Sequence, residues 1–325
     1  MMPTRAMPRR TLVATAAALP LAARAQAPYP DRPIRLITTI PPGGAPDIAA
    51  RILAQPLTER LRQPVVVENR PGSNGLIAAE AAARARPDGT TLLFAQDTVF
   101  TVNPWIYERP PVDVATDLLP VASVASNQFL FAVNPRLPVR TLAEFVALAK
   151  RSDPPLAYAS GGSGSQHQLA MEMLTRRAGI SLLHVPFRGG TPAVTATVAG
   201  DTAAVFSGTS SAPLVREGRL RALAVTGPRR SAAFPELPTI AETYPGYEVT
   251  IWLGLFAPAG LPAPILTRLR EETAAALADP ELRARLDAAG GLEPFPSTPE
   301  AFAALIAADR EKYGALIREI GIRVE

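Results

Sequence analysis

Strand-like segments alternate along this chain with segments of helical periodicity, and this order restricts the fold more than any other feature. Apolar, β-favouring runs bounded by turn residues predict strands at 33–40, 65–68, 91–95, 121–133, 156–159, 182–185, 203–206 and 220–226. Apolar repeats on one helical face predict helices at 48–61, 76–86, 141–151, 166–178, 191–199, 264–278, 280–289 and 299–320. Such alternation produces βαβ units with largely parallel sheets, so the sequence predicts an α/β fold.

Three of the loops that lead from a predicted strand into a predicted helix are built mainly of Gly, Ser and Pro. They are residues 41–47, 69–75 and 160–167. A glycine loop that enters a helix presents unpaired backbone N–H groups at the positive end of the helix dipole, which suits a carboxylate or a phosphate. Glycines also simply make tight turns. Because the loops are distributed over both halves of the chain, together they favour an anion site.

The amino-terminal residues have the parts of a secretory signal. Arg5, Arg9 and Arg10 form a basic start, an apolar run covers 11–23, and a small-residue cleavage site ends at Ala25. The apolar run is too short to span about 30 Å of hydrocarbon. We therefore predict a signal peptide at residues 1–25 and a periplasmic location, with a twin-arginine route also allowed by the paired arginines.

Composition excludes several functional classes. The formal charge of +4 falls to zero once the four arginines of the signal are removed, and no basic block remains, so nucleic acid is not an expected partner. The chain has no cysteine and only His167 and His184, which argues against a His/Cys metal site and against disulfides. A site made only of carboxylates is not excluded. We expect no metal and no cofactor, and the remaining length favours two domains.

The loop 160–167 does not fit the enzyme motifs that it resembles superficially. A dinucleotide fingerprint would need a glycine where His167 stands, and a nucleophile elbow would need a glycine in place of Ser165. An exported hydrolase that uses Ser163 or Ser165 stays as an alternative, but neither histidine is well placed as its base. The sequence thus favours a protein without a catalytic residue.

Several side chains near these loops have two interpretations. Asp47 can cap a helix or contact a ligand, and His167 can cap or pack as well as bind. Asp201 follows Gly200 as a turn residue that could also line a cleft. Arg188 could hold a carboxylate or face solvent.

An ordered set of short motifs resembles a known family. The motifs are Pro41-Pro42-Gly43-Gly44-x-x-Asp47, Asn69-Arg70-Pro71-Gly72, Ser160-x-Gly162-x-Gly164-Ser165-x-x-His167, Pro186-Phe187-Arg188-Gly189-Gly190, 220–226 and 254–260. Together they resemble the Bug family of extracytoplasmic receptors, the solute-binding subunits of tripartite tricarboxylate transporters. The resemblance runs from about Tyr29 to the end of the chain.

The resemblance implies a periplasmic-binding-protein fold of the type II-like kind, with two Rossmann-like domains, a ligand cleft between them and two crossings. Domain 1 would comprise 26–123 plus 249–325 and domain 2 would comprise 124–248, with hinges near 122–126 and 246–250. The C-terminal helix could pack across onto domain 2. We expect a monomer that captures a small carboxylate (a di- or tricarboxylate, an aromatic acid or an amino acid) and delivers it to the membrane subunits of a transporter. A receptor that feeds a sensor kinase is the alternative.

The resemblance also implies which loops hold the ligand. Combined with the reading of single residues, it gives these candidates: Pro42, Gly43, Gly44, Asp47, Asp97, Thr98, Ser160, Gly162, Gly164, Ser165, His167 and Asp201. Asp97 departs from the small residue expected in the family, and Gln166 is also less usual. We expect an ionised Asp97 in the cleft to repel a second carboxylate or to bind an amino group.

Overall fold

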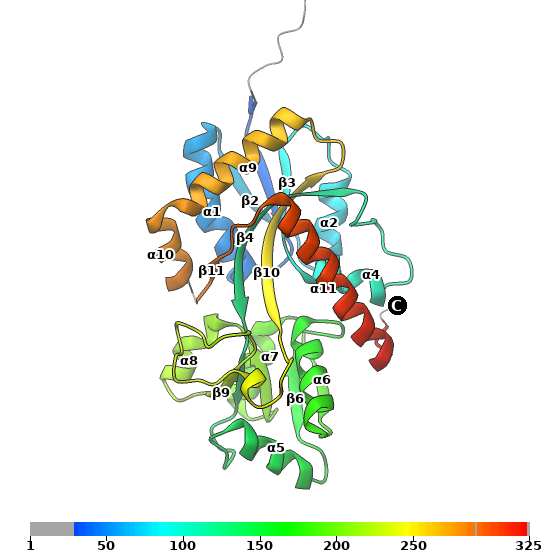
Figure 1. The fold of residues 1–325 in the computed structure, drawn as a ribbon, viewed down its shortest axis with the longest axis vertical. Helices are drawn as coiled ribbons and strands as arrows, with labels where there is room; N and C mark the ends of the chain where they lie inside the picture. Colours follow the sequence, from blue (N-terminus) through cyan, green and yellow to red (C-terminus); the bar gives the residue numbers. More distant parts are fainter. Residues whose placement is uncertain (1–28, 290, 324–325) are drawn as a thin grey trace, which may run out of the picture.

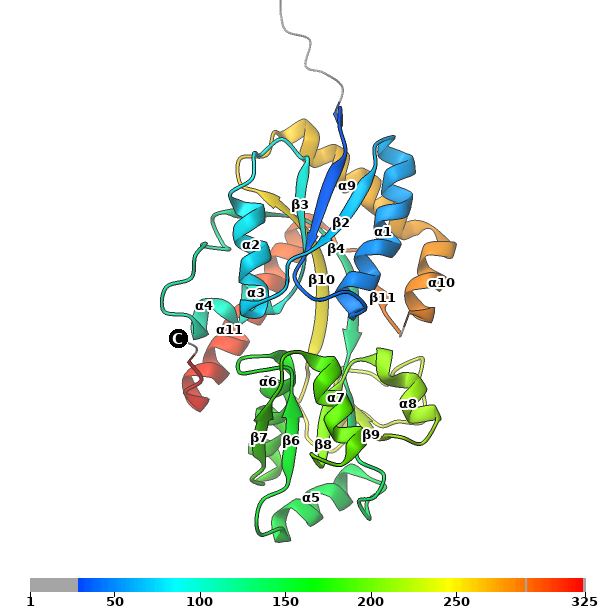
Figure 2. The same ribbon diagram turned by 180° about the vertical axis from the view of Figure 1, so that it is seen from behind.

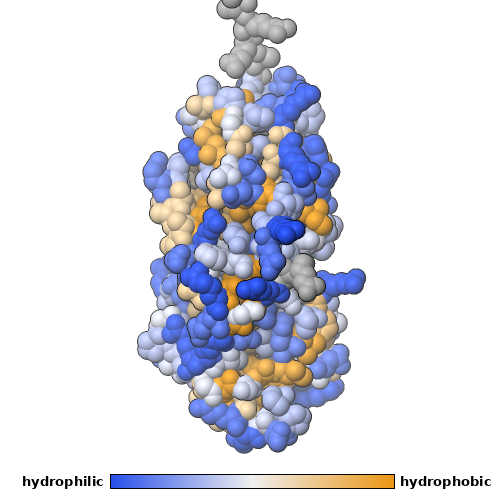
Figure 3. Space-filling model, turned by 90° about the vertical axis from the view of Figure 1, so that its right-hand side faces the viewer, coloured by the Kyte–Doolittle hydropathy of each residue, from blue (hydrophilic) through white to orange (hydrophobic). Residues whose placement is uncertain are grey.

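The computed structural model describes residues 29–289 and 291–323, so the expected signal peptide lies outside the described residues. Two lobes are stacked along the long axis of the molecule (Figure 1). The upper lobe contains both ends of the described chain, and the lower lobe contains its middle. No helix in the described ranges is long and apolar enough to cross a membrane. Seen from the side that carries the C-terminus, hydrophilic residues cover most of the surface, with hydrophobic residues in smaller groups between them (Figure 3).

Domain 1, the upper lobe, is built on a mixed six-stranded sheet. Its strand order is β11 (Glu293–Pro294), β4 (Leu118–Gln128), β10 (Thr250–Pro258), β3 (Thr91–Gln96), β1 (Ile34–Thr38) and β2 (Val65–Asn69). β1 pairs in parallel with β2 and β3, whereas β10 runs antiparallel to β3 and β4. The helices of this lobe are α1 (Ala45–Leu61), α2 (Leu76–Ala83), α3 (Thr98–Thr101), α4 (Asn103–Ile106), α9 (Ala263–Ala278), α10 (Pro280–Ala288) and α11 (Pro299–Ile320).

Two apolar layers cover the faces of this sheet. Buried residues of α1, α9 and α10 pack on one face, and those of α2, α3 and α11 pack on the other. Trp252 and Phe256 of β10 form the centre of the second layer, with Phe302 of α11 edge-on to Trp252 at 5.2 Å between ring centroids. Burial of such aromatic side chains fixes α11 against the sheet.

Domain 2, the lower lobe, contains a five-stranded sheet. Its strand order is β7 (Leu183–Pro186), β6 (Ala157–Ser160), β8 (Ala204–Ser207), β5 (Leu130–Val133) and β9 (Arg221–Val225). β6 is parallel to β7 and β8, and β5 is antiparallel to β8 and β9. Helices α5 (Leu142–Arg151), α6 (Gln166–Ala178), α7 (Gly190–Ala199) and α8 (Ala212–Arg216) surround it, and the short 3₁₀ turns of the chain are η1 (Ser73–Gly75), η2 (Thr209–Ser211) and η3 (Ile240–Glu242).

The chain passes between the lobes at two adjacent places. The single strand predicted at 121–133 is two strands: β4 ends at Gln128 in the upper sheet, and β5 begins at Leu130 in the lower one. The chain returns at Thr250, which pairs with Gln128. Phe129 exchanges hydrogen bonds with Thr226, which fixes the lower side of the passage. The only local sign of the change of sheet is the polar pair Asn127-Gln128, because apolar and small residues continue on either side and no Gly or Pro marks a turn.

The C-terminal helix α11 contacts both lobes. Tyr313 and Ile317 of α11 join Val102 and Ile106 of the upper lobe and Leu169 of α6 in one buried cluster. Arg176 of α6 and Glu319 of α11 form an ion pair at 2.9 Å on the surface beside it. The upper and lower lobes are therefore joined by packed side chains as well as by the two chain passages.

Several helices begin directly after a side chain that caps them. Thr141 accepts a hydrogen bond from the Glu144 N–H while the Glu144 carboxylate reaches back, which completes a capping box at α5. Asp279 caps α10 and Thr298 caps α11. These local signals fix where helices begin without any knowledge of the fold.

Candidate functional site

The carboxyl ends of the parallel strands of the two lobes face one another at the junction. β1 and β3 end there from above, β6, β7 and β8 end there from below, and α1, α6 and α7 begin there (Figure 2). In open α/β sheets this edge is where ligands bind, because loops leaving the strands present helix N-termini. The glycine loops at 41–47 and 160–167 are therefore brought to the same junction.

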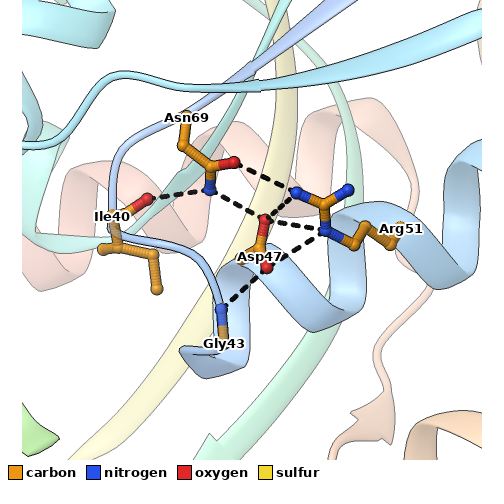
Figure 4. Close-up of polar contacts among 5 residues, drawn as sticks. All are labelled: Ile40, Gly43, Asp47, Arg51 and Asn69. Atoms are coloured by element: carbon orange, nitrogen blue, oxygen red, sulfur yellow. Dashed lines mark hydrogen bonds and ion pairs between the residues drawn. The ribbon is translucent and has the colours of Figure 1, made fainter.

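The loop between β1 and α1 is held from behind by Asp47. The Asp47 carboxylate accepts hydrogen bonds from the Gly43 N–H at 2.9 Å, from Asn69 Nδ2 at 2.8 Å and from Arg51 Nε at 3.1 Å (Figure 4). Asn69 also donates to the Ile40 carbonyl at 3.0 Å. Asp47 is not the N-cap, since Gly44 occupies that position, but it lies in the first turn of α1. Both carboxylate oxygens are occupied by protein donors, so Asp47 positions the loop.

Asp47 is ionised at neutral pH. Burial acts to raise the pKa of Asp47, but the hydrogen bonds from Arg51, Gly43 and Asn69 outweigh burial and hold the pKa below its usual value. The carboxylate is 2% exposed and stands at the positive end of α1, where a negative charge is favourable. The loop geometry therefore depends on a charge that is present throughout the neutral pH range.

The loop between β6 and α6 is held by its own side chains. Ser160, which is fully buried, accepts a hydrogen bond from the Gly162 N–H at 3.1 Å and lies 2.6 Å from His184 Nε2. The Gly164 N–H donates to Gln168 Oε1 at 2.8 Å. Gly162 has φ +123°, a backbone conformation that only glycine adopts readily. This path keeps the loop close to the start of α6.

Several backbone N–H groups at these helix starts are free to bind a ligand. Within the part of the chain that the structure describes, those of Gly44, Ser163, Gln166 and His167 have no protein acceptor. The first N–H groups of a helix have no partner inside the helix. Free donors from both lobes thus point to one junction.

His167 supports the loops of domain 2 as a neutral side chain. Its ring packs at a tilt against Phe129, with 4.7 Å between centroids, and lies against Gly161 and Gly190, where a Cβ atom would stand only 3.0–3.1 Å from it. Burial lowers the pKa of His167 to about 4, so it carries no charge at neutral pH. Its Nδ1 is buried and has no hydrogen-bond partner among the described residues.

Asp97 and Thr98 lie at the end of β3, as the sequence predicts, but they are not open to solvent. Asp97 is fully buried, accepts a hydrogen bond from the Thr98 N–H at 2.9 Å and accepts another from Gln166 Nε2 of α6. Gln96 Nε2 donates to Thr98 Oγ1 at 3.1 Å. The Asp97 carboxyl therefore contacts the other lobe instead of facing an open cleft.

Asp201 is separated from the other candidates. It follows α7, whereas the glycine loops at the junction lie at the other end of that helix, about 15 Å away for a helix of this length. A surface groove runs along α7, lined by Phe187 and Thr191 near the junction and by Asp201 at the far end. Pro42, Gly43, Gly44, Ser160, Gly162, Gly164, Ser165 and His167 all lie on the two loops at the junction or on the first turn of α6.

The structure adds polar groups that the sequence motifs did not single out. Buried hydroxyl oxygens without a partner among the described residues occur on Thr38, the last residue of β1, on Thr39 directly after it, on Ser207, the last residue of β8, and on Thr209 shortly after it. Buried polar atoms are normally satisfied, so such a group at strand ends indicates a place for polar ligand atoms or water. In the sequence, these groups could have been found as hydroxyl residues at the end of an apolar strand or shortly after it.

The hydrolase alternative needs an accessible serine beside a histidine. The serine that meets a histidine is Ser160, whose hydroxyl is buried and already engaged with Gly162. Ser165 instead caps α6 by accepting the Gln168 N–H. Within the described ranges, no group of three or more His, Cys, Asp or Glu side chains is placed to hold a metal ion.

We expect Ser165→Ala to act through the helix cap alone. Loss of the cap should lower the free energy of unfolding by about 1 kcal/mol, measured by urea denaturation. A serine-directed fluorophosphonate should label neither the wild type nor the variant. Labelling of the wild type that disappears in Ser165→Ala would instead support the hydrolase.

Comparison with known proteins identifies this two-lobed arrangement as that of periplasmic solute-binding proteins. A solved periplasmic protein of this kind, BugD, superposes with a TM-score of 0.82 at 29% identity over 91% of this chain and all of that one. A protein of Rhodopseudomonas palustris solved with adipate gives a TM-score of 0.84 at 31% identity, covering 91% and 99% of the two chains. MatC from the same organism, solved with malate, gives 0.79 at 29% identity, covering 89% and 100%.

Residues 49–322 match the family model of the tripartite tricarboxylate transporter family receptor, and the chain belongs to this family. Among curated relatives, BugT of Bordetella pertussis is 34% identical over 300 residues, covering 91% of this chain and 92% of the relative. A Pseudomonas sp. (strain P51) protein from the tcbD-tcbE intergenic region is 37% identical over 294 residues, covering 90% and 87%. The predicted family, two-domain fold and solute-binding function are thereby confirmed, and the family consists of receptors, not enzymes.

Proposed function

We propose that this receptor closes its two domains on a small organic carboxylate and delivers it to the membrane subunits of a tripartite tricarboxylate transporter. The observation that carries the proposal is the set of free backbone N–H groups at the starts of α1 and α6, which face the junction from opposite lobes. The adipate and malate bound to two structural neighbours support the same ligand class.

Backbone donors suit capture and release because they are already fixed. Asp47 and Asn69 hold the upper loop, while Ser160 and Gln168 hold the lower one. Little ordering entropy is lost when a ligand binds to such a site. The arginines near the upper loop, Arg51 and Arg70, are paired with Asp47 and Glu68. The ligand carboxylate would therefore meet peptide dipoles in place of a fixed cation.

The ligand's remaining atoms would meet hydroxyl groups and one neutral ring. Thr39, Ser207 and Thr209 supply buried hydroxyls, and His167 supplies an unpaired ring nitrogen. Such groups accept or donate hydrogen bonds without imposing a charge. We therefore expect acids with a carboxylate at one end and polar or mixed groups beyond it.

Thermal denaturation with a panel of organic acids tests this function. Adipate and malate at about 100 times Kd should stabilise the fold by about 2.7 kcal/mol, which raises Tm by several degrees. Their dimethyl esters are the matched controls, because they keep the carbon skeleton but lack the charge. A broad panel that gives no shift in Tm and no heat in calorimetry would count against carboxylate capture.

We further propose that residues 1–25 direct export to the periplasm and that the mature receptor works as a monomer. The apolar run and the small-residue cleavage site support export. Deletion of the gene separates the two receptor roles: loss of acid uptake supports delivery to a transporter, and normal uptake with loss of an acid response supports a sensor kinase. Size-exclusion chromatography with light scattering checks the oligomeric state.

A further inference from the structure

One buried hydrogen bond between side chains bridges the two domains. Gln166, the first residue of α6 in domain 2, donates a hydrogen bond through Nε2 to Asp97 Oδ2 at the end of β3 in domain 1. Both side chains are buried, Asp97 at 0% exposure and Gln166 at 3%. Two buried side chains 69 positions apart in the chain are therefore in direct contact across the two domains.

The bridge lies at the start of the helix that we propose to hold the ligand carboxylate. Ser165 caps α6, and the free N–H groups of Gln166 and His167 form its first turn. A contact from domain 1 to Gln166 fixes where these donors stand relative to the upper loop. Beside the bridge, Asn74 Nδ2 donates to the Ser163 carbonyl at 3.3 Å, and Leu169 packs against Val102 and Ile106. Separation of the lobes on this side would break all of these contacts.

The surroundings of Asp97 oppose a negative charge on its carboxyl. Burial raises the pKa of Asp97 well above its usual value, and the neighbouring Asp309 raises it further. Lys312 acts in the opposite direction, but its ammonium group lies 2.9 Å from Asp309 Oδ1 and is paired there. Asp309 also accepts a hydrogen bond from Trp252 Nε1 at 2.9 Å. No cation is thus dedicated to Asp97 among the described residues.

The other groups that face this position do not titrate with Asp97 in the neutral range. Tyr313 of α11 has a pKa raised well above its usual value, chiefly by burial. His167, next to Gln166, has a pKa lowered to about 4 by burial. Both are mainly neutral from pH 5 to 9, because this range lies above the pKa of His167 by about one unit or more and below the raised pKa of Tyr313. A change in this range would therefore report Asp97.

We propose that Asp97 is a positioning residue that holds the start of α6 against domain 1 in its protonated form, so that closure of the domains is coupled to uptake of one proton. In the closed arrangement the carboxyl of Asp97 is shielded from water, and burial of a neutral acid costs far less free energy than burial of a carboxylate. When α6 withdraws, the carboxyl regains solvent and ionises. The side-chain amide of Gln166 can donate through Nε2 to the carboxyl oxygen of Asp97 or accept through Oε1 from its protonated oxygen, so it can pair with the neutral acid in either amide orientation.

The sign of the pH dependence follows from this coupling. The pKa of Asp97 is higher in the closed state than in the open state, so closure is fully favoured below the open-state pKa near 3.8. The preference is lost as pH rises through the closed-state pKa. Between these two values the open-to-closed ratio should rise by up to tenfold per pH unit, the limit for one proton.

Distances between two spin labels in the ligand-free protein test the proposal. Because the chain contains no cysteine, labels can be attached at Arg109→Cys, beyond α4 in domain 1, and Ser181→Cys, before β7 in domain 2. Both positions are exposed, and the elements next to them, α4 and β7, lie on the same side of the molecule as α6 (Figure 2). From pH 5 to 9 the fraction of long distances should increase in the otherwise unaltered chain. In Asp97→Asn, which keeps the neutral shape, the distances should stay short at every pH.

Gln166→Leu is the second variant, in case Asp97→Asn does not fold. It removes the amide partner and leaves Asp97 in place, so we expect longer distances at pH 5 than in the unaltered chain. A distribution that is the same from pH 5 to 9, or the same pH profile with and without Asp97→Asn, would overturn the proposal. The coupling of domain closure to proton uptake rests on the proposed function only for its role in ligand capture. Since no ligand is present, failure of the acid panel and failure of this test are separate outcomes.

Discussion

Replacing Gly162 by valine should reduce the affinity for the receptor's acid by about 100-fold while the protein still folds. Gly162 has φ +123°, which a β-branched side chain adopts only with strain of about 1–3 kcal/mol. A Cβ atom there would also stand 3.4 Å from the Phe187 carbonyl oxygen. The loop should relax to another path, and the N–H of Ser163 should leave the junction. Titration calorimetry measures the affinity, with the acid that gives the largest shift in Tm.

Two further glycine variants separate an effect on the ligand loops from a general effect of strain. Gly43 has φ +86°, and no heavy atom lies within 4 Å of a Cβ built there, so Gly43→Val acts through backbone strain alone. It should also weaken ligand binding. Gly218→Val is the matched control, because Gly218 also has positive φ, is exposed and belongs to the turn after α8. It should lower stability without changing affinity. Unchanged affinity in both loop variants would contradict the assignment of the two loops to the ligand.

Removal of the Asp47 carboxylate should affect both stability and binding. Asp47→Ala leaves the Gly43 N–H without an acceptor and leaves the Asn69 amide only its hydrogen bond to the Ile40 carbonyl, whereas the half-exposed Arg51 can turn to water. We expect a loss of about 2–3 kcal/mol in the free energy of unfolding, typical for a buried charged acceptor, and at least tenfold weaker binding. Thr141→Ala removes a cap of comparable kind far from the junction. It should cost about 1 kcal/mol and leave affinity unchanged.

The effect of Asp47 should also depend on pH. The pKa of Asp47 is lower in the folded protein than its usual value of 3.8. Its stabilisation is therefore present above pH 3.8 and is lost as pH falls through the folded-state pKa. The difference in stability between the wild type and Asp47→Ala should shrink in acid. A difference that stays constant from pH 7 to pH 2.5 would show that the charge is not what holds the loop.

Local patterns predicted most elements of the fold because their causes are local, although β10 was not among the predicted strands. A glycine loop between an apolar strand and an amphipathic helix, as at 160–165, specifies a strand, a turn and a helix start within a few residues. Thr141, Asp279 and Thr298 specify helix starts in the same way. Since parallel strands end at one edge of a sheet, these patterns also predicted that the glycine loops gather there.

Contacts between distant residues could not be predicted in this way. Asp97 was expected in the open cleft. Its burial could not be foreseen, because it depends on Gln166 and on α11, which come much later in the chain. The pair of Ser160 and His184 arises from the neighbouring strands β6 and β7, and their pairing register is not visible in either segment alone. The change of sheet at Phe129 was hidden because only the polar pair Asn127-Gln128 marks it, without a Gly or Pro.

A crystal structure of the receptor with the acid that gives the largest shift in Tm tests the central claim most directly. The account predicts one ligand carboxylate between the domains, about 3 Å from N–H groups of both the Gly43–Gly44 loop and the Ser160–Ser165 loop. An acid bound only in the surface groove beside Thr191 and Asp201, or contacting one domain alone, would contradict it.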